Sequence, residues 1–136
     1  MSRCFADTAY FIALLSPSDE AHAAAVRESA RRDRQTVTTS AVLNEFGNYF
    51  AKPPNRGVVR NFILALRQNR LFTLVQIDER LFDLALDLYG DRPDKLWSLT
   101  DCILFVVMRE MGLADVLTTD HHFEQAGFTL LLPRGS

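Results

Sequence analysis

The stretch Trp97-Ser98-Leu99-Thr100-Asp101-Cys102-Ile103-Leu104-Phe105-Val106-Val107-Met108 decides how this chain folds. Every residue from 102 to 108 is apolar, and a helix that is apolar on all sides is a buried one. Ser98 or Thr100 can cap the free N–H groups of its first turn. Asp101 lies in that turn, where the helix dipole favours a negative charge. The stretch predicts a central core helix, and Asp101 is either its cap or part of a site.

The length and composition are those of one ordinary globular domain. A chain of 136 residues can bury a hydrophobic core without disulfides or a structural metal ion. Its apolar runs fall short of the ~20 residues that span a bilayer, and the N-terminus lacks a signal-peptide pattern. Cys4 and Cys102 lie in apolar surroundings, as reduced core cysteines do. We expect a cytoplasmic protein without a membrane span; the net charge of −2 neither supports nor excludes a nucleic-acid partner.

Short apolar or β-branched runs alternate with helical patterns along the chain. Strands are predicted at about 4–6, 36–39, 72–75, 114–118 and 128–132, with helices at about 8–15, 18–33, 41–51, 56–69, 79–89 and 98–111. Ser40, Asn55 and Asp78 are expected to cap three of these helices. The alternation predicts one α/β domain over residues 1–132, with a largely parallel sheet of four to five strands and helices on both faces. Residues 133–136 are expected to form a C-terminal tail.

Four carboxylates fall where this sheet would bring them together. Asp7 ends the first strand, Asp120 follows the fourth, Asp101 begins the helix before it, and Glu45 lies one turn into the helix after the second strand. Sites in parallel α/β sheets form beyond the carboxyl ends of the strands. Each residue alone also fits a turn, a cap or a solvated helix surface. Converging carboxylates repel one another, and Mg²⁺ or Mn²⁺ relieves the repulsion because these ions prefer oxygen ligands.

The pieces around these carboxylates resemble a known family. They are Phe5-Ala6-Asp7-Thr8, Ser40-Ala41-Val42-Leu43-Asn44-Glu45, Ser98-Leu99-Thr100-Asp101-Cys102 and Leu117-Thr118-Thr119-Asp120-His121-His122-Phe123. In this order, over nearly the whole chain, they resemble a PIN domain of the kind found in the VapC toxins of bacterial toxin–antitoxin pairs. The resemblance implies hydrolysis of RNA phosphodiesters with Mg²⁺ or Mn²⁺. It implies that Asp7, Glu45, Asp101 and Asp120 are the metal ligands and catalytic residues.

The same resemblance implies partners. Small PIN toxins usually form homodimers and are held inactive by a segment of an antitoxin protein. We expect apolar residues near the N-terminus to be available for such contacts, namely Tyr10, Phe11, Phe50 and Phe62. The RNA target, the cleavage position and the number of metal ions do not follow from the sequence.

Several other polar residues are candidates for supporting roles. The hydroxyls of Thr100 and Thr118 could orient the carboxylates. Lys95 precedes the central helix and is a candidate phosphate contact, and Arg56 and Arg60 share one strip of their helix, as a path for RNA would require. The exposed face of the helix at about 18–33 is expected to carry Arg27, Arg31, Arg32 and Arg34, and the last three form a second basic group. Ordinary solvated helix faces explain both groups of arginines equally well.

The remaining chemically reactive side chains have simpler interpretations. His121 and His122 are interpreted as surface residues, because hard cations prefer oxygen ligands. Cys102 is interpreted as a packing residue, because the sequence places no histidine to activate it.

Two other functions are compatible with this pattern. A receiver-like phosphoacceptor also has aspartates at strand ends, but it would need an acidic pair beside one aspartate and a lysine at the end of a late strand. A catalytically silent interaction module could keep the PIN fold, and the complete acidic set argues against it.

Overall fold

The sheet is built from five parallel strands in the order β3-β2-β1-β4-β5. The computed structural model describes residues 1–132, so the expected tail at 133–136 lies outside the described residues. The strands are β1 (Ser2–Ala6), β2 (Arg34–Thr39), β3 (Phe72–Val75), β4 (Asp115–Leu117) and β5 (Thr129–Leu130). The central strand is β1, which pairs with both β2 and β4. The predicted α/β class and parallel sheet are confirmed.

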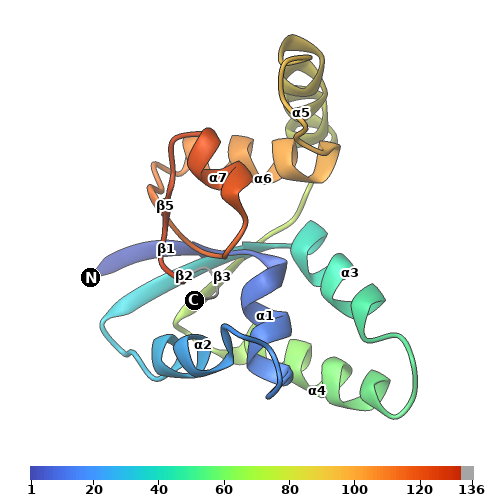
Figure 1. The fold of residues 1–136 in the computed structure, drawn as a ribbon, viewed down its shortest axis with the longest axis vertical. Helices are drawn as coiled ribbons and strands as arrows, with labels where there is room; N and C mark the ends of the chain where they lie inside the picture. The colour runs from blue at the N-terminus through green and yellow to red at the C-terminus, as the bar shows by residue number, and fades with distance from the viewer. Residues whose placement is uncertain (133–136) are drawn as a thin grey trace.

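Helices cover both faces of this sheet, as predicted (Figure 1). On one face lie α1 (Thr8–Leu15), α2 (His22–Ser29) and α4 (Asn55–Gln68), and α3 (Ser40–Tyr49) packs against α1 and α4. On the other face lie α6 (Leu99–Glu110) and α7 (His121–Gln125), while α5 (Glu79–Asp91) packs against α6 and projects outward. Within the described residues, no helix has the length and apolar character needed to cross a bilayer.

The core has an aromatic cluster on each side of the sheet. In α6, residues 102–108 are buried except for the partly accessible Val106, and Phe105 makes edge-to-face contacts with Trp97 and Phe123. On the opposite side, Phe11 packs against Phe46, Phe62 and Phe72. Each fully buried aromatic ring contributes roughly 1.5–3 kcal/mol of hydrophobic stabilisation. These two clusters fix α1 and α6, the helices that begin beside the predicted site.

The helix beginnings differ in part from the sequence-based prediction. Ser98 caps α6 and Asp78 caps α5, as expected. Thr39, and not Ser40, caps α3, because the last residue of β2 already has the extended backbone that a cap requires. The Ser40 hydroxyl instead accepts a hydrogen bond from the Ile77 N–H at 3.0 Å. Asn55 is the first residue of α4 and makes no side-chain cap.

Arg27 and, in the second basic group, Arg31 and Arg32 are exposed, as predicted, but Arg34 is not. Helix α2 ends at Ser29, and Arg34 starts β2 as a buried residue. Its Nη1 lies 2.9 Å from Glu28 Oε2, because a guanidinium removed from water requires a carboxylate partner. Arg34 is therefore unavailable to RNA.

The apolar residues expected to serve as contacts are also largely internal. Tyr10 and Phe11 are buried, whereas Phe50 and Phe62 are partly buried and pack on the core, because all four join the aromatic cluster beneath the sheet. The exposed large apolar side chains of the described helices and loops lie elsewhere and include Tyr49, Val58, Leu64, Phe82, Leu84, Leu86, Tyr89 and Leu96.

Candidate active site

The ends of β1 and β4 place Asp7 beside Thr118. Ala6 pairs with Leu117 in the sheet. Asp7 and Thr118 directly follow these two residues, at the carboxyl edge of the sheet. The Thr118 hydroxyl donates a hydrogen bond to Asp7 Oδ2 at 2.8 Å. From β1 the chain adds β2 and β3 on one side, and it later adds β4 and β5 on the other side. The carboxyl ends of β1 and β4 therefore form the switch point, where open α/β sheets bind ligands.

Asp7 is a buried carboxyl group whose pKa is raised from 3.8 to about 7. Desolvation is the largest cause, and the negative charges of Glu45 and Asp120 raise the pKa further. Hydrogen bonds from Thr118 and from the Thr8 backbone oppose the shift without cancelling it. Asp7 is the N-cap residue of α1, yet its side chain makes no capping hydrogen bond.

Asp120 follows Thr118 and is held on the same edge. Its backbone N–H donates to the Thr118 hydroxyl at 3.1 Å, and its Oδ1 accepts from the His122 N–H at 2.9 Å. Asp120 thereby caps α7. Thr118 contacts the carboxylate of Asp7 and the backbone N–H of Asp120, so it fixes these two residues relative to each other.

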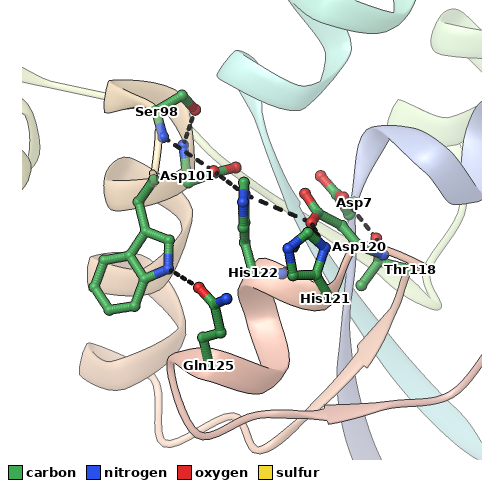
Figure 2. A network of polar contacts seen from close by, with 9 residues as sticks. Asp7, Ser98, Asp101, Thr118, Asp120, His121, His122 and Gln125 are labelled. Carbon is green, nitrogen blue, oxygen red and sulfur yellow. Dashed lines mark hydrogen bonds and ion pairs between the residues drawn. The ribbon is translucent and has the colours of Figure 1, made fainter. Parts of the chain in front are cut away.

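An imidazole joins Asp101 to this group. His122 Nδ1 lies 3.0 Å from Asp101 Oδ2 and 3.6 Å from Asp120 Oδ1 (Figure 2). Asp101 also accepts from the Ser98 N–H and completes a capping box. The interpretation of both histidines as surface residues is therefore wrong for half-buried His122, although His121 is exposed. The Asp120 cap places the backbone N–H of His122, but the contact of its ring with Asp101 depends on how α7 packs beside α6, which the sequence does not indicate.

Glu45 approaches from α3. Its Oε1 accepts a hydrogen bond from the Thr8 hydroxyl at 2.7 Å, and its charge acts on the pKa of Asp7. Thr8 was not among the predicted site residues, although it follows Asp7 directly. Glu45 itself is exposed. Three of the predicted carboxylates are thus electrostatically coupled, and the fourth, Asp101, reaches them through His122.

The donor set fits a hard divalent cation. Within residues 1–132, every ion pair of a lysine or arginine involves other carboxylates, so none neutralises Asp7, Glu45, Asp101 or Asp120. The exposed carboxylate of Glu45 leaves the group open to solvent. Carboxylate oxygens and water are the ligands that Mg²⁺ and Mn²⁺ prefer.

The other predicted residues occupy three separate places in the fold. Lys95 and Ser98 line a cavity of ≈ 610 Å³ between α5 and α6. Arg56 and Arg60 line another, of ≈ 600 Å³, between α3 and α4. Thr100 lies in the first turn of α6, and its hydroxyl makes no hydrogen bond to any described residue.

Known proteins share this sequence pattern and this fold. The PIN domain family model matches residues 4–129. The 23S rRNA-specific endonuclease VapC20 of Mycobacterium tuberculosis (strain CDC 1551 / Oshkosh) is 28% identical over 132 residues, which cover 95% of this chain and 98% of that protein. The crystal structure of Mycobacterium tuberculosis VapC20, a sarcin-ricin loop cleaving toxin, has a TM-score of 0.85 at 23% identity and covers 97% of this chain and 100% of that one.

Two further crystal structures share the fold. VapBC2 from Rickettsia felis, bound to a DNA fragment from its promoter, has a TM-score of 0.68 at 10% identity, covering 94% of this chain and 96% of that one. FitAcB from Neisseria gonorrhoeae has a TM-score of 0.66 at 18% identity, covering 93% and 95% respectively. The family model spans nearly every described element and all four carboxylates. This chain therefore belongs to the PIN domain family.

Proposed function

We propose that this protein is a Mg²⁺- or Mn²⁺-dependent endoribonuclease and the toxin of a toxin–antitoxin pair. The observation that carries the proposal is the gathering of Asp7, Glu45 and Asp120, with Asp101 joined through His122, at the switch point of a PIN-domain sheet. No arginine or lysine of the described chain neutralises them. A buried Asp7 whose pKa is about 7 is a group that gains from a nearby cation.

The four carboxylates would hold the ion, and Asp7 would be its most buried ligand. When bound, a divalent ion polarises a phosphoryl oxygen and lowers the pKa of a water molecule, which supplies the nucleophile. Thr118 orients Asp7 through its hydroxyl, and Thr8 restrains Glu45. His122 restrains Asp101 against the beginning of α7. These contacts limit the side-chain motion that a site for phosphoryl chemistry cannot tolerate.

The substrate strand would pass between two basic cavities. Asn48 lines the cavity that contains Arg56 and Arg60, and it also lines a shallow depression with Thr8 and Glu45. The phosphates of an RNA strand that runs from the carboxylates toward this cavity would lie near Arg56 and Arg60. On the other side, Lys95 lines the cavity beside Ser98, and its ammonium group lies 6.0 Å from the centroid of the Trp97 ring.

Similar proteins indicate the class of RNA and of partner. VapC20 is named as an endonuclease specific for 23S rRNA, so structured ribosomal RNA is the first substrate to test. VapBC2 is similar in fold, and by analogy we propose an antitoxin partner. We propose action in the cytoplasm and a homodimer from the resemblance to small PIN toxins. Neither the silent-module nor the receiver-like alternative gains support from the site. Neither β4 nor β5 contains the lysine that a receiver requires.

The direct test is cleavage of a mixed pool of RNA, including ribosomal RNA, with Mg²⁺, Mn²⁺ or EDTA. The parent should cleave with either ion and not with EDTA, and Asp7→Asn should lose the activity. Asp115→Asn is the matched control, because Asp115 begins β4 at the opposite edge of the sheet. A parent that binds Mn²⁺ but cleaves no RNA would favour the silent module, and cleavage in EDTA would contradict the metal mechanism.

A further inference from the structure

Two imidazoles and a carboxylate converge at the beginning of α7. His121 Nδ1 lies 3.8 Å, and His122 Nδ1 3.6 Å, from the same Asp120 Oδ1. The two rings lie side by side (Figure 2). Their centroids are 4.5 Å apart. One potential ligand atom of each residue lies within 4.8 Å of the other two. A site made only of carboxylates does not require these nitrogen atoms.

The spacing of these atoms matches the ligand shell of a small transition-metal ion. Ligands at ~2.0–2.1 Å in a tetrahedral arrangement lie about 3.3–3.4 Å from one another. The two nitrogen-to-oxygen distances, 3.6 and 3.8 Å, exceed this value by only a few tenths of an ångström. Asp101 Oδ2 lies 3.0 Å from His122 Nδ1 and accepts a hydrogen bond from it in the metal-free protein. An ion that binds Nδ1 replaces this proton, and the Asp101 carboxylate then lies beside the ion as a further oxygen donor.

The donor atoms of this cluster select the class of ion. A single ion between the two rings, whose centroids are 4.5 Å apart, can receive a nitrogen lone pair from each of them. Imidazole nitrogen with carboxylate oxygen is the donor set that Zn²⁺ and related ions use, whereas Mg²⁺ prefers oxygen alone.

The cluster is both anchored and open. Asp120 is fixed by the Thr118 hydroxyl and by the His122 backbone N–H, and His122 is half-buried. The His121 side chain is 56% exposed, which leaves the cluster accessible from solvent. A metal ion can therefore enter this cluster from the solvent side without unfolding of the protein.

We propose that Asp120, His121 and His122, completed by Asp101, form a mixed nitrogen–oxygen site that binds a transition-metal ion such as Zn²⁺ in preference to Mg²⁺. The site goes beyond the proposed nuclease function but shares Asp120 and Asp101 with it. An ion bound here competes with the catalytic ion for these two carboxylates. Zn²⁺ is therefore expected to inhibit cleavage that Mg²⁺ supports.

The test is a titration of the metal-free protein with Co²⁺, whose visible absorption reports nitrogen ligands and a low coordination number. The parent should show such a band, and Zn²⁺ should abolish it. His121→Ala and His122→Ala should each weaken Co²⁺ binding about tenfold or more, because loss of even an outer partner of a metal ligand costs ~10–100-fold in affinity. His22→Ala is the matched control, because the third histidine of the chain lies on α2, where its Nδ1 is 2.7 Å from the Ala13 carbonyl oxygen.

The outcomes separate this site from the proposed nuclease. Asp7→Asn should lose RNA cleavage and keep the Co²⁺ band, and a band without any RNA cleavage by the parent would refute only the nuclease. A parent without a band, or His121→Ala and His122→Ala that bind Co²⁺ as the parent does, would overturn the inference. Thermal melts in EDTA check the fold of each variant. If His122→Ala does not fold, Co²⁺ binding by His121→Ala alone tests the inference, because His121 is exposed and its loss should not affect folding.

Discussion

Asp7 is the residue whose environment departs most from that of a free side chain. Its pKa of about 7, against an ordinary 3.8, means that the metal-free folded protein keeps a proton that the unfolded chain releases. Between these two values the folded state binds more protons than the unfolded state, so this group lowers stability as the pH rises. The loss is complete above about pH 7 and absent below about pH 4.

We therefore predict that Asp7→Asn stabilises the metal-free protein at pH 8, because asparagine carries no charge to desolvate. The gain should be roughly 2–4 kcal/mol. At pH 3 parent and variant should agree closely, since Asp7 is then mostly protonated in both folded and unfolded chains. Urea unfolding in EDTA at the two pH values measures the difference. An equal difference at both pH values would show that the Asp7 carboxylate is not desolvated.

The residues of the site were only partly predictable from the sequence. Asp7, Thr118 and Asp120 follow strand ends, and such positions can be read from a pattern of apolar runs. His122 was missed because its contact depends on the angle at which α7 leaves Asp120, and a five-residue helix leaves no periodic signal.

The central helix was the element that the sequence predicted best. The all-apolar run from 102 to 108 requires burial on every side, and α6 has it apart from Val106. The boundaries of α2 and the cap of α3 were harder to predict from the sequence, because they depend on tertiary contacts. Arg34 leaves the expected helical region to pair with Glu28, and Thr39 ends its strand in a cap conformation.

Phe105 tests the contribution of α6 to the fold. Its side chain is fully buried and contacts the rings of Trp97, Phe123 and Phe128. Phe105→Ala should lower the free energy of unfolding by about 3–5 kcal/mol, through lost burial and the cavity that remains. Urea unfolding measures it, with Phe82→Ala as control, because Phe82 on α5 is 41% exposed. A similar, small loss in both variants would mean that α6 is not the central core element.

The whole molecule brings together elements that are far apart in sequence. The order β3-β2-β1-β4-β5 places the end of β1 beside the end of β4, more than one hundred residues later. Alternating helices and strands predicted the parallel sheet, but the order of its strands is a tertiary property that no local pattern contains. Convergence of the carboxylates was therefore an expectation that only the fold could test.

A ligand that binds only the folded state should stabilise the whole molecule. Millimolar Mg²⁺ or Mn²⁺ should raise the melting temperature of the parent by several degrees, since saturation at a hundred times Kd contributes ~2.7 kcal/mol. Differential scanning fluorimetry with and without EDTA measures the shift, and Asp7→Asn should reduce it. An unchanged melting temperature at millimolar Mn²⁺ would count against the metal site.

Asp101→Asn gives the most direct test of the central claim that these carboxylates hold a catalytic metal ion. Asparagine keeps the size of the side chain and can still accept the capping hydrogen bond from the Ser98 N–H, so the thermal melt should change little. The charge that a divalent ion requires is lost. We predict that Mg²⁺- or Mn²⁺-dependent cleavage of RNA falls by orders of magnitude in the folded variant. A folded Asp101→Asn protein that cleaves RNA at the parent rate would contradict the mechanism.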